Sequence, residues 1–447
     1  MQSAGLRHRS RDVASIQLEG FDSSVAGGVK PLVKDEDGGF EPPRFVVNLA
    51  LPPAQRYAHI VPHIQQQLSN ADFNGLFYDV VRSVAPPMLA KLLHVLARFG
   101  LRGVYSREET EELRGISKAT GVALHLLVAF NVLLDLLLGC TSGGCRVEVD
   151  RKSGLSTADD DTSTSMLHFR TLDWGMDVLR QIVIEVDFVF SDGGPVVATS
   201  VTYFGYVGVL TGVRENLSMS LNFRPHHDRT TFRKRLGFRI HQLLVVLGLR
   251  QGISSVLRGY LLAPHDDDDD QEPDMGHNKP LEKLSLAEGG PRMGRILKQL
   301  SSSPSTAAYL IFCTPQVVYS IEKDHRAASV RTSQSFLATY NHDVDDESNT
   351  SRAKDAAEDL VGGPASGMED LVRYSTDRKK HLDSLWRKAI NRRRRQLKST
   401  AHAVAIDDLL QIVKDVEISN DETHYSVLMD PQNGKVVWRR VYAGNDD

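Results

Sequence analysis

The spacing of apolar residues changes at Cys140, and this change constrains the fold more than any other feature of the sequence. Before Cys140, apolar residues recur at the intervals expected of helices. After it they occupy alternate positions, as in the run Ile182, Ile184, Val186, Phe188 and Phe190. Alternation of this kind is typical of a strand with one face in a core, and Glu185 and Asp187 fall on the opposite face. The sequence therefore predicts an α+β chain in which a helical portion precedes strands.

The portion before Cys140 predicts several helices. Residues 57–69 and 73–99 have helical spacing, and two adjacent prolines interrupt the second stretch. Ser106 and Glu109 form a capping box, because each side chain can satisfy an end amide of the helix that begins there.

Residues 121–139 are mostly apolar and could be mistaken for a membrane span. His125, Asn131 and Asp135 lie inside this stretch, and each is costly in lipid. We therefore expect a buried core helix that ends at Gly139, and no transmembrane segment.

Cys140 follows this helix in an unusual setting. Gly139 suits a sharply turned backbone at a helix end. Hydroxyl residues and glycines follow the cysteine before a strand begins near Arg146. This order predicts a thiol at the edge of a sheet, next to flexible backbone. The alternative is a buried structural cysteine, which is the usual state of a free thiol.

Composition divides the chain into three parts. Residues 1–40 are polar and rich in Gly, Ser and Asp, which predicts a disordered tail. Residues 41–139 form the helical segment, and residues 140–447 form the part that carries the strands. Two stretches of this last part, near 264–291 and 343–372, are acidic or rich in small residues, and we expect both to be loop insertions.

The overall charge and the cysteines restrict the setting in which the chain works. A net charge of −4 gives no overall attraction to nucleic acid, and the arginine run 392–395 is expected on an exposed helix. Three cysteines are too few for a disulfide framework, which favours a reducing compartment. Residues 1–20 lack the apolar stretch of a secretory signal. We therefore expect a cytoplasmic location, with a lysosome-like or vacuole-like compartment as the alternative.

No motif indicates a metal or a cofactor. The sequence contains no His-Glu-x-x-His, no Gly-x-Ser-x-Gly and no Walker-type loop. The pair His226-His227 alone is a weak metal signal and is expected on the surface. We therefore expect no cofactor.

Five stretches resemble, in the same order, segments of one known family. They begin at Pro43, Asn131, Arg170, Gly205 and Ser220 and read PRFVVNLALPPAQRY, NVLLDLLLGCTS, RTLDWG, GYVGVLTG and SLNFR. Together they resemble the acid ceramidase and N-acylethanolamine acid amidase family, which belongs to the N-terminal-nucleophile hydrolases and is close to choloylglycine hydrolases and penicillin V acylases. The likeness covers about residues 42–442, with the two insertions as additions. One departure is Thr171, which stands where the family usually has Asn.

The resemblance implies a fold and a catalytic site. The fold is an αββα sandwich of antiparallel sheets, with residues 41–139 as an α-subunit after cleavage before Cys140 and residues 140–447 as the β-subunit. The freed α-amine of Cys140 would act as the base for its own thiol.

Four further residues have roles that the resemblance implies. Arg170 would lower the pKa of the thiol, and Asp173 would orient the α-amine. Asn341, in an Asn-aromatic-Asp motif that here reads Asn-His-Asp, would donate to the oxyanion. Arg378 would hold this constellation in place.

The resemblance also implies a lipid-like amide as substrate, either ceramide, which would yield a fatty acid and sphingosine, or an N-acylethanolamine. The alternatives are an acylase of the choloylglycine or penicillin V type, and a non-catalytic lipid-binding relative. Residues 88–101 mix apolar and basic side chains and suit transient contact with a membrane interface. Packing inside the helical layer is the alternative for this stretch.

Overall fold

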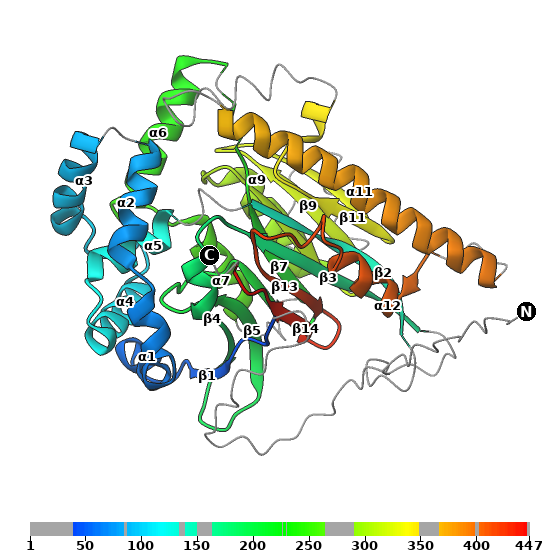
Figure 1. Ribbon diagram of the computed structural model, residues 1–447, viewed down its shortest axis with the longest axis horizontal. Coiled ribbons are helices and arrows are strands. Elements are labelled where there is room, and N and C mark those ends of the chain that lie inside the picture. The colour runs from blue at the N-terminus through cyan, green and yellow to red at the C-terminus, as the bar shows by residue number, and fades with distance from the viewer. Residues whose placement is uncertain are drawn as a thin grey trace, which may run out of the picture.

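Two sheets packed face to face form the centre of the computed structural model (Figure 1). The structure describes residues 39–84, 87–133, 139–149, 163–225, 227–228, 230–263, 290–347, 366–397 and 402–444. Within these ranges the strands are β1 (Arg44–Asn48), β2 (Gly139–Val149), β3 (Ser163–Asp173), β4 (Val183–Val189), β5 (Val196–Tyr203), β6 (Thr211–Arg214), β7 (Leu217–Phe223), β8 (Ala308–Cys313), β9 (Val318–Lys323), β10 (Ala328–Ser333), β11 (Phe336–Thr339), β12 (Val404–Ala405), β13 (Thr423–Asp430) and β14 (Lys435–Val441).

The helices fall into a group before Cys140 and a group after it. They are α1 (Val61–Asn70), α2 (Phe73–Val84), α3 (Pro87–Gly100), α4 (Arg107–Thr120), α5 (Leu124–Leu133), α6 (Phe232–Val246), α7 (Ile253–Leu262), α9 (Gly290–Ser302), α11 (Ser366–Leu397) and α12 (Ile406–Val413).

The strands form an eight-stranded and a six-stranded sheet. The eight-stranded sheet has the order β1-β4-β5-β6-β7-β8-β9-β10. The six-stranded sheet has the order β11-β2-β3-β13-β14, with β12 beside β2. The pairs β1–β4 and β12–β2 are parallel, whereas the other pairs are antiparallel.

Helices cover the outer face of each sheet. Strands β2 and β3 contact β7 and β8 across the interface between the sheets. Helix α7 packs on β5, β6 and β7, and α12 packs on β2 and β3 with α11 alongside it (Figure 1). The order helix, sheet, sheet, helix confirms the predicted αββα sandwich with an α+β composition.

The part of the chain before Cys140 contains strand β1 and helices α1 to α5. Helix α2 ends at Val84 and α3 begins at Pro87, so the proline pair interrupts the helical stretch 73–99, as predicted. The Ser106 hydroxyl accepts the Glu109 N–H at 3.3 Å and caps α4. The Glu109 carboxylate, however, accepts the Ser255 hydroxyl at 2.7 Å. Among the described residues the Ser106 half of the capping box therefore forms, whereas the Glu109 side chain contacts α7.

The predicted backbone around Gly139 is wrong. Among the described residues α5 ends at Leu133, and β2 already begins at Gly139, so Cys140 is the second residue of a strand. The following glycines allow close packing rather than a turn. A Cβ atom on Gly143 would lie 2.3 Å from the Leu337 carbonyl oxygen, and one on Gly144 would lie 2.5 Å from Cβ of Val318.

Other predictions met different outcomes. Helix α11 begins at Ser366, so the end of the stretch 343–372 is helical rather than a loop. His227 is buried, not on the surface, since it stacks on Phe238 with ring centroids 3.7 Å apart. The predictions for 1–38, 264–289 and 348–365 fall outside the described residues. In the arginine run, Arg393 pairs with Glu148 and Arg392 with Asp408.

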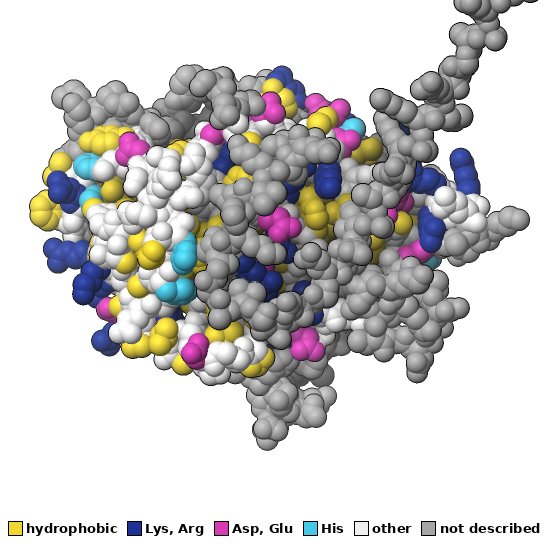
Figure 2. Space-filling view, turned by 60° about the horizontal axis from the view of Figure 1, so that its bottom comes forward, with side chains coloured by type: hydrophobic (Ala, Val, Ile, Leu, Met, Phe, Trp, Pro, Cys, Tyr) yellow, Lys and Arg dark blue, Asp and Glu magenta, His cyan; other side chains and the backbone are white. Residues whose placement is uncertain are grey.

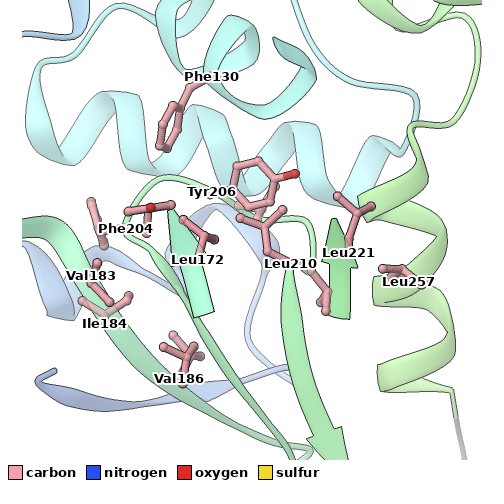
Figure 3. Packing of buried hydrophobic residues seen from close by; sticks show 14 of the residues in the cluster. Phe130, Leu172, Val183, Ile184, Val186, Phe204, Tyr206, Leu210, Leu221 and Leu257 are labelled. Carbon is pink, nitrogen blue, oxygen red and sulfur yellow. The ribbon is translucent and has the colours of Figure 1, made fainter. Parts of the chain in front are cut away.

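The main core contains residues from both sides of Cys140. Phe130 of α5, Leu172 of β3, Leu221 of β7 and Leu257 of α7 belong to the same buried cluster (Figure 3). Burying a side chain of this size contributes about 1.5–3 kcal/mol. The helical segment and the sheets therefore stabilise one another and fold as one body.

An ion cluster joins β1 to the strand that follows it in the sheet. Glu185 of β4 was expected on the less buried face, but it is buried. Its carboxylate lies 3.1 Å from Nε of Arg44 and 2.8 Å from Nε of Arg439. Burial raises the pKa of Glu185 to about 7, and the two guanidinium groups act in the opposite direction. Asp187 accepts Nε of Arg44 at 2.6 Å.

We expect this cluster to make the protein less stable as the pH rises. A carboxyl group whose pKa is higher when folded favours the folded state most below its unfolded pKa of about 4.3, and this contribution is lost as the pH rises toward 7. The loss is on the order of 2–3 kcal/mol for the free energy of unfolding. Glu185→Gln should flatten the dependence. Thermal unfolding of both proteins from pH 4.5 to 7.5 measures it, and parallel curves would contradict the assignment.

Candidate functional site

The register of β2 and β3 builds the candidate site. Gly139 lies opposite Asp173, Cys140 opposite Leu172, and Ser142 opposite Arg170. Because side chains alternate along a strand, the cysteine shares the inner face of the sheet with Arg170, and Asp173 belongs to the other face. The pairing thus brings Cys140 and Asp173 to the same end of the six-stranded sheet, with their side chains on opposite faces.

Arg170 contacts the thiol directly. Its Nη2 donates to Sγ of Cys140 at 3.2 Å. Its Nη1 donates to the carbonyl oxygens of Leu221, at 2.7 Å, and Leu210, at 2.9 Å. Both carbonyls come from the eight-stranded sheet and the loop before β6, so this sheet fixes the guanidinium that faces the thiol.

The thiol of Cys140 is fully buried, and this decides its protonation. Burial raises its pKa to about 11, although the positive charges of Arg170 and Arg378 act to lower it and the charge of Asp173 raises it further. Arg170 does act to lower the thiol pKa, as predicted, but desolvation raises the pKa by more than Arg170 lowers it. The thiol is therefore protonated near neutral pH.

Asn341 lies just beyond β11 and bridges the two sheets. Its Oδ1 accepts the backbone N–H of Cys140 at 2.7 Å, and its Nδ2 donates to the Phe223 carbonyl at 2.7 Å. The Ser375 hydroxyl accepts the backbone N–H of Asn341 at 2.8 Å. Asn341 thus holds the nitrogen of the Gly139–Cys140 peptide, a contact that differs from the expected oxyanion donation.

Asp173 and Arg378 form an ion pair on the other side of the strand pair. The second carboxylate oxygen of Asp173 accepts the Thr423 hydroxyl at 2.7 Å, and Arg378 also donates to the Thr141 hydroxyl at 3.2 Å. A Cβ atom on Gly139 would lie 3.4 Å from Cβ of Asp173, so the carboxylate side chain borders the peptide before Cys140.

All five residues predicted from the sequence therefore meet at one end of the six-stranded sheet. Sequence reasoning assigned no role to Thr423, Thr141, Ser142 and Asn222. Asn222 accepts the Ser142 hydroxyl at 2.7 Å and donates to the Thr339 carbonyl at 3.2 Å. These contacts depend on how the sheets stack, and no pattern within one strand encodes that.

The arrangement offers a nucleophile with a fixed cation and a peptide bond next to it. Among the described residues no group of His, Cys, Asp or Glu side chains could hold a metal ion. The cysteines Cys140, Cys145 and Cys313 are free and buried. Of these three, Cys140 receives the recorded guanidinium contact.

Comparison with known proteins supports the resemblance. The family model described as the beta subunit of N-acylethanolamine-hydrolyzing acid amidase matches residues 40–105. These residues precede Cys140 and lie in the part that the resemblance assigned to the α-subunit, so the two subunit names differ for the same residues.

Two relatives show the same likeness. An N-acylethanolamine-hydrolyzing acid amidase of Caenorhabditis elegans is 27% identical over 198 residues, which are 42% of this chain and 49% of that protein. The acid ceramidase of Rattus norvegicus is 28% identical over 200 residues, 41% of this chain and 45% of its own length. The matched part thus spans about half of these relatives.

A solved Caenorhabditis elegans ortholog of N-acylethanolamine-hydrolyzing acid amidase aligns with a TM-score of 0.39 and 19% identity, covering 66% of this chain and 93% of that one. The family match and the two relatives confirm the resemblance to the acid ceramidase and N-acylethanolamine acid amidase family.

We expect Asp173→Asn to cost stability as well as function. The variant would leave the guanidinium of Arg378, whose side chain is 11% exposed, without its carboxylate. Removing one partner of a buried pair typically costs about 3–5 kcal/mol. If Cys140 is the nucleophile of an amide hydrolase, the rates of cleavage before Cys140 and of amide hydrolysis should fall about 100-fold.

A double variant separates the two effects. Asp173→Asn with Arg378→Met removes both charges and should recover most of the lost melting temperature, but not the activity. Thermal unfolding and the two rates are measured on the same preparations. Recovery of activity along with stability would show that Asp173 only neutralises Arg378.

Proposed function

We propose that this chain, a relative of the acid ceramidase and N-acylethanolamine acid amidase family, is an amide hydrolase that uses Cys140 as an N-terminal nucleophile. The observation that carries the proposal is the setting of Cys140. Its thiol faces the Arg170 guanidinium at 3.2 Å, and its backbone nitrogen is held by Asn341 at 2.7 Å. Asp173 lies opposite the preceding glycine.

The first step is cleavage of the chain itself. Sγ of Cys140 attacks the carbonyl carbon of Gly139, the C–N bond breaks, and the nitrogen takes up the thiol proton to become the α-amine of Cys140. Water then hydrolyses the thioester, which releases the Gly139 carboxylate and restores the thiol. The amine remains beside Asn341 and Asp173, and the negative charge of Asp173 stabilises the ammonium that forms when the amine takes up a thiol proton in the hydrolysis step.

The same atoms then hydrolyse a bound amide. The α-amine, with an ordinary pKa of about 7.7–8.0, takes the proton of the thiol as Sγ attacks the substrate carbonyl, and it returns the proton to the leaving amine. Water cleaves the acyl thioester and releases the fatty acid. Arg170 stabilises the thiolate throughout, because its guanidinium is fixed by two carbonyl oxygens.

The buried state of the thiol supports an inactive precursor. Cys140 is 0% exposed, and its pKa is raised to about 11 in the uncut chain. A nucleophile must be both deprotonated and accessible. Cleavage supplies a base, and it frees residues on the amino-terminal side of Cys140 to move.

The proposed substrate is a fatty-acyl amide, as the names of the relatives suggest, and the surface of the helices suits a lipid interface. Phe232, Ile240 and Leu243 of α6 are exposed, as is Phe99 of α3, and Phe232 and Phe99 are each 68% exposed. Arginines 233, 235 and 239 are exposed on the same helix. Figure 2 shows apolar and basic side chains interspersed at its left, where Figure 1 has the helical segment.

Exposed apolar side chains interspersed with basic ones can bind at the surface of a bilayer. Among the described residues no helix is both long and apolar enough to cross a membrane. Contact at the interface would bring the enzyme to an amide that is held in the bilayer, and α6 extends the contact predicted for residues 88–101.

The proposal is tested by following chain splitting and hydrolysis together. Purified protein incubated at mildly acidic pH should yield two fragments, 1–139 and 140–447, which co-elute because β1 stays in the eight-stranded sheet. Intact mass and size exclusion measure this. The same sample is assayed on ceramide and on N-palmitoylethanolamine side by side, which identifies the preferred amide.

Cysteine variants provide the controls. Cys140→Ala should abolish splitting and hydrolysis, whereas Cys145→Ala should retain both, since Cys145 is equally buried but has no recorded guanidinium contact. An uncut chain with full activity, or an active Cys140→Ala variant, would overturn the proposal.

Membrane contact has its own prediction. Phe232→Ser with Leu243→Ser should weaken binding to vesicles of phosphatidylcholine with an anionic phospholipid by at least about tenfold, because each side chain forfeits about 1.5–3 kcal/mol of burial. The matched control is Val416→Ser, another exposed apolar residue that lies just after α12. Vesicle flotation measures the bound fraction, and equal binding by all three proteins would exclude α6 as the contact.

A further inference from the structure

We propose that Arg224 and Asp343 are positioning residues for the nucleophile, and that their buried ion pair holds Asn341 against the nitrogen of Cys140. The inference rests on the proposed function and adds to it two residues that lie outside the contacts of the thiol itself.

The pair joins the same two segments that Asn341 joins. Asn341 donates to the carbonyl of Phe223, the last residue of β7. One residue later, Arg224 donates from Nε and Nη2 to the two carboxylate oxygens of Asp343, at 2.7 and 2.6 Å. The segment after β7 and the turn after β11 are thus fastened at two points, with the functional amide as one of them.

A third strand braces the carboxylate. The Tyr309 hydroxyl of β8 donates to Asp343 at 2.8 Å, and the Arg224 guanidinium lies over the Tyr309 ring, 5.7 Å from its centroid. Nη1 of Arg224 also donates to the Lys323 carbonyl at 3.3 Å. The ion-paired side chains of Arg224 and Asp343 are 10% and 5% exposed. A two-pronged arginine–carboxylate pair fixes orientation as well as distance.

Asn341 links this ion pair to the backbone nitrogen of Cys140. Asn341 uses both ends of its amide, one on Phe223 and one on Cys140. A shift of the turn that carries Asn341 and Asp343 would therefore move the nitrogen of the peptide to be cut, or release it. A displacement of about 1 Å in a reacting group can reduce a rate by 100-fold.

The test compares two carboxylates with closely similar partners. Asp343→Asn is matched by Asp187→Asn, because Asp187 also accepts from an arginine, Arg44, at 2.6 Å and from a hydroxyl, Thr199, at 2.6 Å, but lies on β4 away from the site. Each variant is assayed at a temperature at which it is fully folded.

We expect Asp343→Asn to slow chain splitting and to lower kcat about ten- to a hundredfold with KM nearly unchanged. Asp187→Asn should change each by less than about twofold. Splitting and kcat that fall equally in both variants, or in neither, would overturn the inference, since a purely structural pair predicts no difference beyond stability.

Two further measurements separate a loss of positioning from a loss of stability or of the proposed activity. Hydrogen exchange measured on the uncut chain, in the peptide that contains Cys140, should be faster in Asp343→Asn than in Asp187→Asn, because the backbone N–H of Cys140 donates to Asn341. This readout does not need activity, so failure of the proposed function is distinguishable from failure of the inference. If Asp343→Asn does not fold, Tyr309→Phe removes one bond to the same carboxylate and should show a smaller effect in the same direction, whereas unchanged exchange would count against the inference.

Discussion

The pairing of β2 with β3 is the constraint on which the rest of the site depends. Placing Gly139 opposite Asp173 puts a carboxylate beside the peptide that precedes Cys140, and it puts Arg170 on the face of the thiol. A shift by one residue would reverse both faces, because side chains alternate along a strand. Strand β2 with its glycines, the eight-stranded sheet and helix α11 each contribute contacts to one face of this strand pair. These contacts favour the observed register.

The buried arginines of this site are each bound by groups from a neighbouring layer of the fold. Arg170 is held by carbonyls of the eight-stranded sheet, while Arg378 comes from the outer helix to Asp173. Buried ions of this kind add little net stability, because desolvation offsets their attraction, but they penalise every arrangement in which a partner is missing. They therefore favour one geometry of the site over others, and covalent chemistry requires reacting groups that are held in one geometry.

Sequence alone predicted much of this, for reasons that can be stated residue by residue. The break at Gly139 singled out Cys140, and family resemblance added Arg170, Asp173, Asn341 and Arg378. Gly139 was misread because a glycine suits a turn and a tightly packed strand equally. Thr423 and Asn222 were missed because their contacts arise from strand order and sheet stacking, which join segments as much as 250 residues apart, as for Thr423 and Asp173.

The position of β1 in the sheet has a consequence for how the protein folds and how long its folded state persists. Its partner side chain Asp187 lies 143 residues after Arg44, so at ordinary rates of synthesis β1 waits roughly 7–30 s for β4 to emerge. While the chain is whole, β1 and β4 meet as parts of one molecule. If the proposed cleavage before Cys140 takes place, an unfolded fragment must find its partner from solution, at a far lower effective concentration. The two-fragment protein that we propose would persist through slow unfolding, because it could refold only as two pieces that have to meet again.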